Sequence, residues 1–80
     1  MGVKVRYFAG ARAAAGVSEE EIEAGSVGEL KVALADRHGP ALEKVLAAAT
    51  LLVEGRAARE ESLALDAGAT VEVLPPFAGG

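Results

Sequence analysis

The chain ends in the segment Pro75-Pro76-Phe77-Ala78-Gly79-Gly80, directly after the alternating residues 70–74. Proline has no backbone N–H to donate and cannot continue the hydrogen-bond ladder of a strand, so the two prolines end the sheet here. They also favour an extended, polyproline-like direction for the residues that follow. We therefore expect one folded domain over residues 1–74 and an extended tail over residues 75–80.

The tail has the shape of a stiff arm with a thin tip. Six extended residues reach about 20 Å, at roughly 3.3–3.6 Å each. Phe77 supplies one apolar anchor, whereas Ala78, Gly79 and Gly80 carry almost no side chain. Such a tip can bring the free carboxylate of Gly80 into a channel too narrow for a bulky side chain, and Gly79 provides the clearance. The alternative is a terminus without function, as many termini are.

Composition limits the remaining possibilities. Eighty residues, 51% hydrophobic and 25% charged, are typical of one small globular domain. The chain has no cysteine, which excludes disulfides, a thiolate nucleophile and cysteine-based metal sites. The net charge is −4 and the eight Lys and Arg are scattered, so we expect no nucleic-acid partner. The apolar runs are too short to cross a bilayer, and we expect a cytoplasmic protein with no membrane association.

Hydrophobic periodicity predicts an α+β fold with a mixed sheet of about five strands and one main helix across it. Alternation predicts strands at residues 3–8, 17–23, 50–53, 56–58 and 70–74. Helical spacing predicts a short turn at residues 9–16, a main helix that ends near residue 38, and a second helix at residues 41–49.

Local signals mark the ends of the main helix and the charged edge of the sheet. Ser26 and Glu29 form a capping-box pattern, and the Gly39-Pro40 pair ends the helix. We expect His38 to face solvent in the last turn, in preference to acting as a catalytic base. The run of glutamates at 19–21 is expected to be a solvated strand edge, in preference to a metal site.

Two apolar residues interrupt the polar face of the predicted sheet. Phe8 falls on the face of Lys4 and Arg6, and Leu74 falls on the face of Glu72. If the first and last strands are parallel neighbours, Phe8 and Leu74 lie together at their ends. With Phe77 they would form an apolar patch at the root of the tail, a feature typical of partner surfaces. The alternative is that a loop covers them.

Three segments of the chain resemble a known family, namely 5–9 (Val-Arg-Tyr-Phe-Ala), 13–16 (Ala-Ala-Ala-Gly) and 68–80, which ends Leu-Pro-Pro-Phe-Ala-Gly-Gly. They are similar to the small subunit of molybdopterin synthase, the MoaD group of ubiquitin-like β-grasp sulfur carriers, with the ThiS thiamine carriers as relatives. Element order and length agree over essentially the whole chain, and the Pro-Pro-x-x-Gly-Gly ending is the specific part.

The resemblance implies a carrier that is not an enzyme by itself and binds no cofactor. A ubiquitin-activating-like, MoeB-like enzyme would use ATP to adenylate Gly80, and a sulfur donor would convert it to a thiocarboxylate. The tail would then enter a MoaE-like large subunit and donate sulfur to a pterin precursor. The docking residues implied are Phe8, Leu74 and the tail residues Pro75, Pro76, Phe77 and Ala78. A third docking position, often large and apolar in the family, falls at 57–59, where this chain has Ala-Ala-Arg.

Three other functions share this pattern. A thiamine-pathway or cysteine-forming sulfur carrier would have the same fold and tail. A ubiquitin-like protein modifier would end as an isopeptide on lysine. A structural β-grasp module would have an inert tail.

Overall fold

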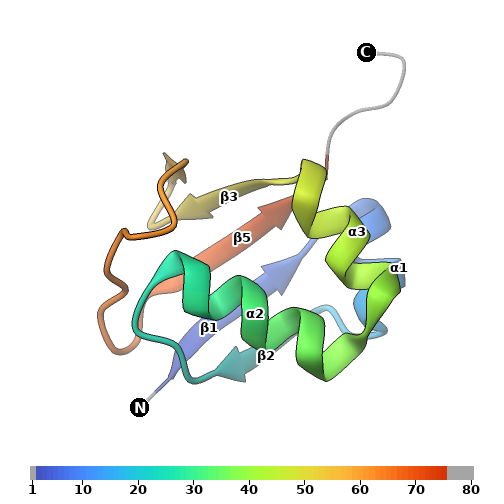
Figure 1. Ribbon diagram of the computed structural model, residues 1–80, viewed down its shortest axis with the longest axis horizontal. Coiled ribbons are helices and arrows are strands. Elements are labelled where there is room, and N and C mark those ends of the chain that lie inside the picture. Colours follow the sequence, from blue (N-terminus) through green and yellow to red (C-terminus); the bar gives the residue numbers. More distant parts are fainter. Residues whose placement is uncertain (1, 76–80) are drawn as a thin grey trace.

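The computed structural model describes residues 2–75, which form a five-stranded sheet with three helices (Figure 1). In chain order the elements are β1 (Val3–Tyr7), α1 (Ala9–Ala15), β2 (Glu19–Ile22), α2 (Val27–His38), α3 (Pro40–Ala48), β3 (Thr50–Val53), β4 (Arg56–Ala58) and β5 (Thr70–Leu74). The strand order is β2-β1-β5-β3-β4. The α+β fold with a mixed five-stranded sheet and one main helix is therefore confirmed, and α1 and α3 correspond to the short helical turn and the second helix that the sequence predicts.

The central strand β5 and its neighbour β1 are parallel, whereas the other neighbouring pairs are antiparallel. Figure 1 shows the arrows of β1 and β5 side by side and pointing the same way. The first and last strands of the chain thus meet in the middle of the sheet. Their carboxyl ends lie at the same edge of the sheet, where the chain leaves β5 toward Pro75.

The hydrophobic core lies between the helices and one face of the sheet. Strand alternation puts every second residue of β1 and β5 on this face, and the apolar stripe of α2 packs against it. The largest fully buried side chains are Val3, Val5, Val27, Leu30, Leu34, Leu42, Leu51, Val71 and Val73. Figure 1 shows α2 and α3 on this side of the sheet. The opposite face carries the alternate residues of each strand, and none of the three helices within residues 2–75 covers it.

The ends of α2 follow the sequence signals closely. The Ser26 hydroxyl accepts a hydrogen bond from the Glu29 N–H at 3.2 Å. The Glu29 carboxylate reaches back to the Gly25 N–H at 2.9 Å, one residue earlier than in a standard capping box. At the other end, Gly39 has a φ of 87°, which glycine adopts without strain, and Pro40 begins α3. This junction fixes where His38 lies.

Candidate docking site at the end of the two central strands

Phe8 and Leu74 occupy equivalent positions at the ends of β1 and β5. Tyr7 is opposite Val73 in the parallel register, so each of the two residues follows a paired position. The Phe8 N–H donates to the Val73 carbonyl oxygen at 3.3 Å, which extends the pairing by one step. Phe8 also caps α1 in an extended conformation, with φ −126° and ψ 148°. The predicted parallel neighbours are confirmed, and both side chains remain partly exposed.

Arg6 links this apolar pair to the charged part of the open face. Its guanidinium carbon lies 5.6 Å from the centroid of the Phe8 ring, within the range of a cation–π contact. One of its nitrogens lies 4.0 Å from a carboxylate oxygen of Glu72, the residue opposite it on β5. Arg6 thus holds the Phe8 ring from one side. Strand alternation puts Arg6 and Phe8 on the same face, so this contact could have been predicted from the sequence.

Leu52 is a third apolar residue on the open face, and it was not predicted from the sequence. It lies opposite Glu72 across the β3–β5 pair, and Thr50 lies opposite Leu74. Leu52 is therefore the diagonal neighbour of Leu74 on the same face, within reach of a large side chain. It is partly exposed, and the residue opposite it on β4 is Ala57. The small side chain of Ala57 thus leaves Leu52 partly exposed on the open face.

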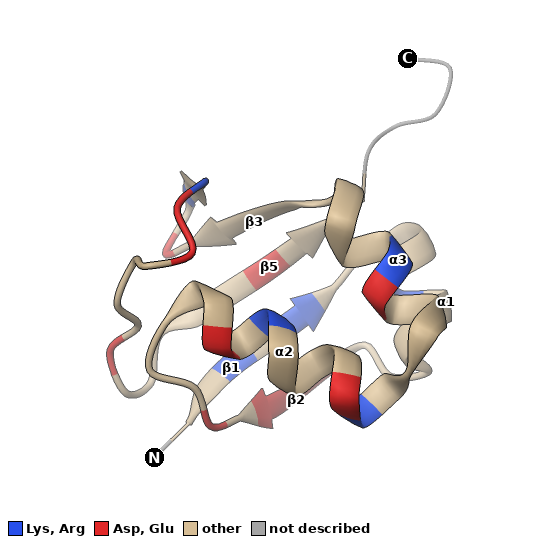
Figure 2. Cartoon of the chain, in the orientation of Figure 1, with Lys and Arg blue, Asp and Glu red and all other residues tan. Residues whose placement is uncertain are grey.

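Charges of alternating sign run across the same face beside the apolar residues. Figure 2 shows blue segments on β1 between red segments on β2 and β5. Lys4 pairs with Glu19 at 3.8 Å, and Arg6 pairs with Glu72 at 4.0 Å. Exposed pairs of this kind contribute about 0–1 kcal/mol to stability. They border the apolar corner formed by Phe8, Leu74 and Leu52 with charges of both signs.

Of the predicted tail residues, the structure describes Pro75 alone. It follows Leu74 directly and is partly exposed. The predictions for Pro76, Phe77, Ala78, Gly79 and Gly80 concern positions outside the described residues. Their roles remain predictions, as does the division into a domain over 1–74 and a tail over 75–80.

Two predictions about charged residues are wrong. Glu20 is not solvated, although the run of glutamates at 19–21 was expected to be, and His38 does not face solvent. The Glu20 side chain is only 11% exposed and that of His38 only 12%. Glu20 accepts from the Tyr7 hydroxyl at 2.5 Å, from Arg37 Nε at 2.8 Å and also contacts His38 Nε2. The Tyr7 and His38 rings meet edge to face, with centroids 5.9 Å apart. The reason is alternation: Glu20 points to the helix side of β2, where α2 ends, while Glu19 and Glu21 point to the open face.

The pKa values of this cluster follow from its hydrogen bonds. Burial alone would raise the pKa of Glu20, but hydrogen bonds from Tyr7 and His38 and the charges of His38 and Arg37 outweigh it, so the pKa lies below its usual range. Burial and the bond to Glu20 raise the pKa of the Tyr7 hydroxyl above its usual range. The cluster fastens the end of α2 to β1 and β2. It lies on the helix side of the sheet, on the face opposite the apolar corner.

Two further observations bear on the kind of site. Across residues 2–75, no three or more His, Cys, Asp or Glu residues are grouped so that they could hold a metal ion. In the same part of the chain, every helix is too short or too polar to cross a membrane. On the open face, Phe8, Leu74 and Leu52 are partly exposed apolar residues with charged residues beside them.

The fold and the position of this surface define a ubiquitin-like β-grasp protein. The sequence matches the model of the ThiS family over residues 5–80. The chain belongs to the ThiS family, to which the MoaD-type small carriers are related, and the resemblance stated from the sequence is confirmed. No curated protein sequence matches the chain at a significant level.

Several solved structures share the fold over nearly the full length. One is named molybdopterin converting factor, subunit 1, from Pyrococcus furiosus; it is 33% identical, covers 96% of this chain and 99% of its own, and has a TM-score of 0.80. The small archaeal modifier protein 1 (SAMP1) from Methanosarcina acetivorans is 27% identical over 99% of this chain and 96% of its own, with a TM-score of 0.87. A complex of subunits 1 and 2 of molybdopterin-converting factor from Helicobacter pylori 26695 includes a chain 24% identical, with full coverage of both chains and a TM-score of 0.76. This last likeness shows the fold alone.

Proposed function

We propose that this chain is a sulfur carrier and acts as the small subunit of a molybdopterin synthase. The observation that carries the proposal is the position of Phe8 and Leu74, which form an apolar corner at the point where the chain leaves β5 for a Gly-Gly ending. The 33% identity to a molybdopterin converting factor subunit 1 supports the choice of pathway. The chain by itself is a carrier and not an enzyme.

The chemistry follows from the terminal carboxylate. A C-terminal carboxyl group has a pKa of about 3.3–3.7, so it is ionised at neutral pH and is a poor electrophile. A MoeB-like partner transfers AMP from ATP to one carboxylate oxygen of Gly80, with release of pyrophosphate. Sulfur at the sulfide oxidation level then attacks the carbonyl carbon and displaces AMP, which leaves a thiocarboxylate without any change of oxidation state. Gly79 allows the backbone to pass close to phosphates and catalytic groups.

The folded domain holds the partner while the tail reacts. The apolar corner of Phe8, Leu74 and Leu52 docks on a MoaE-like large subunit, and the charged residues beside it set the orientation. Docking makes sulfur transfer from the tail to the pterin precursor effectively intramolecular, which removes much of its entropic cost. In this assignment Pro75, Pro76, Phe77 and Ala78 line the path from the docking surface to the active site of the partner.

The test is the mass of the C-terminal peptide of protein isolated from its native cell. Cleavage after Arg59 yields residues 60–80, which contain no methionine, so oxidation of Met1 cannot imitate the exchange of oxygen for sulfur. A thiocarboxylate on Gly80 would support a sulfur carrier. A free acid under conditions where the cofactor pathway is running would contradict it. Co-purification with a MoaE-like subunit, as opposed to a thiazole synthase or a cysteine-forming enzyme, then identifies the pathway.

A second candidate is a protein modifier, favoured by the likeness to SAMP1 at 27% identity. In that case Gly80 would form an isopeptide bond with lysines of other proteins. Epitope-tagged protein would then give a ladder of larger species on denaturing gels, and removal of Gly79 and Gly80 would abolish it.

A further inference from the structure

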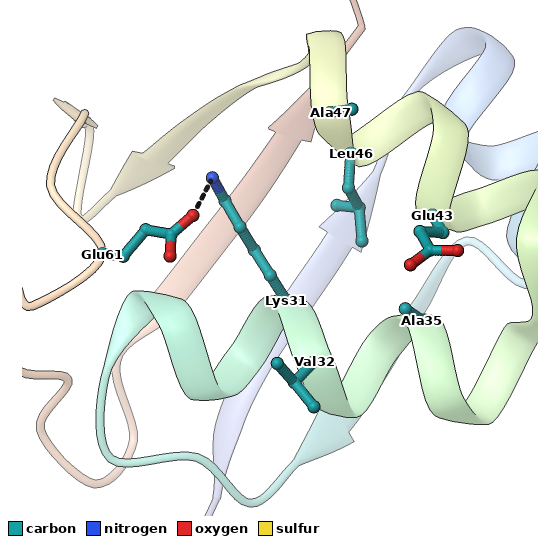
Figure 3. A pocket seen from close by; sticks show the side chains of 7 residues that line it. All are labelled: Lys31, Val32, Ala35, Glu43, Leu46, Ala47 and Glu61. Atoms are coloured by element: carbon teal, nitrogen blue, oxygen red, sulfur yellow. Dashed lines mark ion pairs between the residues drawn. The ribbon is translucent and has the colours of Figure 1, made fainter.

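A groove between α2 and α3 is not used by the fold or by the proposed docking surface. It has a volume of about 310 Å³ and lies on the helical side of the molecule (Figure 3). Val32 and Ala35 of α2 form one wall, and Leu46 and Ala47 of α3 form the other. A second hollow of about 340 Å³ shares Val32 and Ala35 with it and continues toward the junction of the two helices. The two hollows lie side by side along α2, and together they are called the groove.

Val32 makes this groove unlike an ordinary polar helix surface. Its side chain is 71% exposed, against 41% for Val17 and 43% for Leu63, the other exposed large apolar residues among those described. A β-branched residue is also a poorer helix former than most. Val32 thus contributes neither burial nor helix propensity to this fold. An apolar partner would supply the burial that the chain itself does not.

The charges along the groove are unbalanced. Lys31 is already paired with Glu61 at 3.6 Å, and Figure 3 shows this pair at one end of the groove. Asp36 and Glu43 line the continuation, are exposed, and have no ion pair among the described residues. Arg37, the other basic residue of α2, is held by Glu20 at 2.8 Å. Asp36 and Glu43 thus place two negative charges, in no ion pair among the described residues, beside the apolar walls of the groove.

We propose that this groove docks a short amphipathic helix of a protein partner, which inserts one large apolar side chain and places Lys or Arg beside Asp36 and Glu43. A helix is the fitting occupant because both walls are helices, which offer no strand edge for an added strand. The basic residues follow from charge complementarity. The groove lies on the helix side, so it remains accessible while the open sheet face is occupied. This inference does not depend on the chemistry of Gly80.

The probe for the test is a synthetic amphipathic peptide with a Leu and Phe stripe bordered by Lys, added to the full-length, amide-labelled protein. We expect the amide resonances of residues 31–47 to shift, with those of β1 and β5 unchanged. The same peptide with Glu in place of Lys should cause no shift. Absence of groove shifts with the Lys peptide up to about 1 mM would overturn the proposal.

Matched variants separate the groove from general charge attraction. Glu43→Lys should weaken binding of the Lys peptide at least tenfold, whereas Asp66→Lys, the same charge change at an exposed position outside the groove, should not. Val32→Thr keeps the β-branched shape and should weaken binding by removing the apolar contact. Equal effects of Glu43→Lys and Asp66→Lys would refute the site. Concentration-dependent shifts in the groove without peptide would mean that the occupant is a second copy of the chain, which would also refute it.

Discussion

The Tyr7 hydroxyl donates a 2.5 Å hydrogen bond to Glu20, which joins the core residue of β1 to a carboxylate of the edge strand β2. The same carboxylate accepts from Arg37 and contacts His38 at the end of α2. The largely buried Glu20 carboxylate thus connects three elements, namely β1, β2 and the end of α2. Hydrogen bonds to a charged group contribute about 1.5–3 kcal/mol each when buried.

Glu20→Gln should therefore lower the free energy of unfolding by about 2–3 kcal/mol at neutral pH. The amide keeps an acceptor oxygen but loses the charge that attracts Arg37. Chemical denaturation monitored by circular dichroism measures the change. Glu21→Gln is the matched control, since Glu21 is exposed on the open face, and it should change stability by less than about 0.5 kcal/mol. If Glu20→Gln lowered the free energy of unfolding no more than Glu21→Gln does, the cluster around Glu20 would not stabilise the fold.

The same acid predicts how stability depends on pH. The pKa of Glu20 is lower in the folded state than the ordinary value of 4.5, so the folded state favours the ionised form. Its stabilising effect is fully present above the unfolded pKa and is lost as the pH falls through the folded pKa. We expect the protein to lose stability below about pH 4.5, and we expect Glu20→Gln to show a smaller loss over that range. Denaturation curves at several acid pH values test this, and identical slopes for the two proteins would contradict it.

The contrast between Phe8 and Glu20 shows what the sequence could reveal. Strand alternation alone predicts that Phe8 and Leu74 lie on the open face. They also lie side by side, because β1 and β5 are parallel neighbours. The partners of Glu20 are set by the angle at which α2 crosses the sheet, and His38 is eighteen residues away. Strand alternation puts the Glu20 side chain on the other face of β2 from Glu19 and Glu21. However, a run of three like charges favoured the interpretation that all three side chains are solvated. Leu52 was missed because the register of β3 against β5 depends on pairing over long range.

Two glycines at the second position of their helices should respond in opposite ways to alanine. A Cβ on Gly10 would meet no atom within 4 Å, whereas a Cβ on Gly28 would lie 3.2 Å from both Cβ and O of Glu61. The Gly28 N–H also donates to that carbonyl at 2.8 Å. Gly10→Ala should raise the free energy of unfolding by about 0.5–1 kcal/mol. Gly28→Ala should lower it by about 1 kcal/mol, because the loop must move. Thermal denaturation compares them, and stabilisation by both would disprove the tight contact.

The docking surface predicts which changes weaken binding to a large subunit. Phe8→Asp and Leu52→Asp each place a charge in the apolar corner, and we expect each to weaken binding at least tenfold, or about 1.4 kcal/mol. Both residues are partly exposed, so the fold should remain. Leu63→Asp is the control, because Leu63 is 43% exposed and lies outside the sheet. Calorimetric titration with a MoaE-like subunit gives the affinities. Unchanged affinity for Phe8→Asp would remove this surface from the proposed function.

Gly79→Val tests the clearance that the tail requires. Valine adds a branched side chain next to the reacting carboxylate, so the tip should no longer fit a channel shaped for glycine. The substitution lies outside the folded domain as we propose it, and the thermal stability should equal that of the unaltered protein. We expect at least a hundredfold loss in adenylation or sulfur transfer, measured by mass spectrometry of residues 60–80 after incubation with activating enzyme, ATP and a sulfur donor. Ala78→Val, one residue farther from the carboxylate, should have a smaller effect. Full conversion of the Gly79→Val tail, with normal cofactor output, would refute the role assigned to Gly79, since clearance is the only function proposed for it.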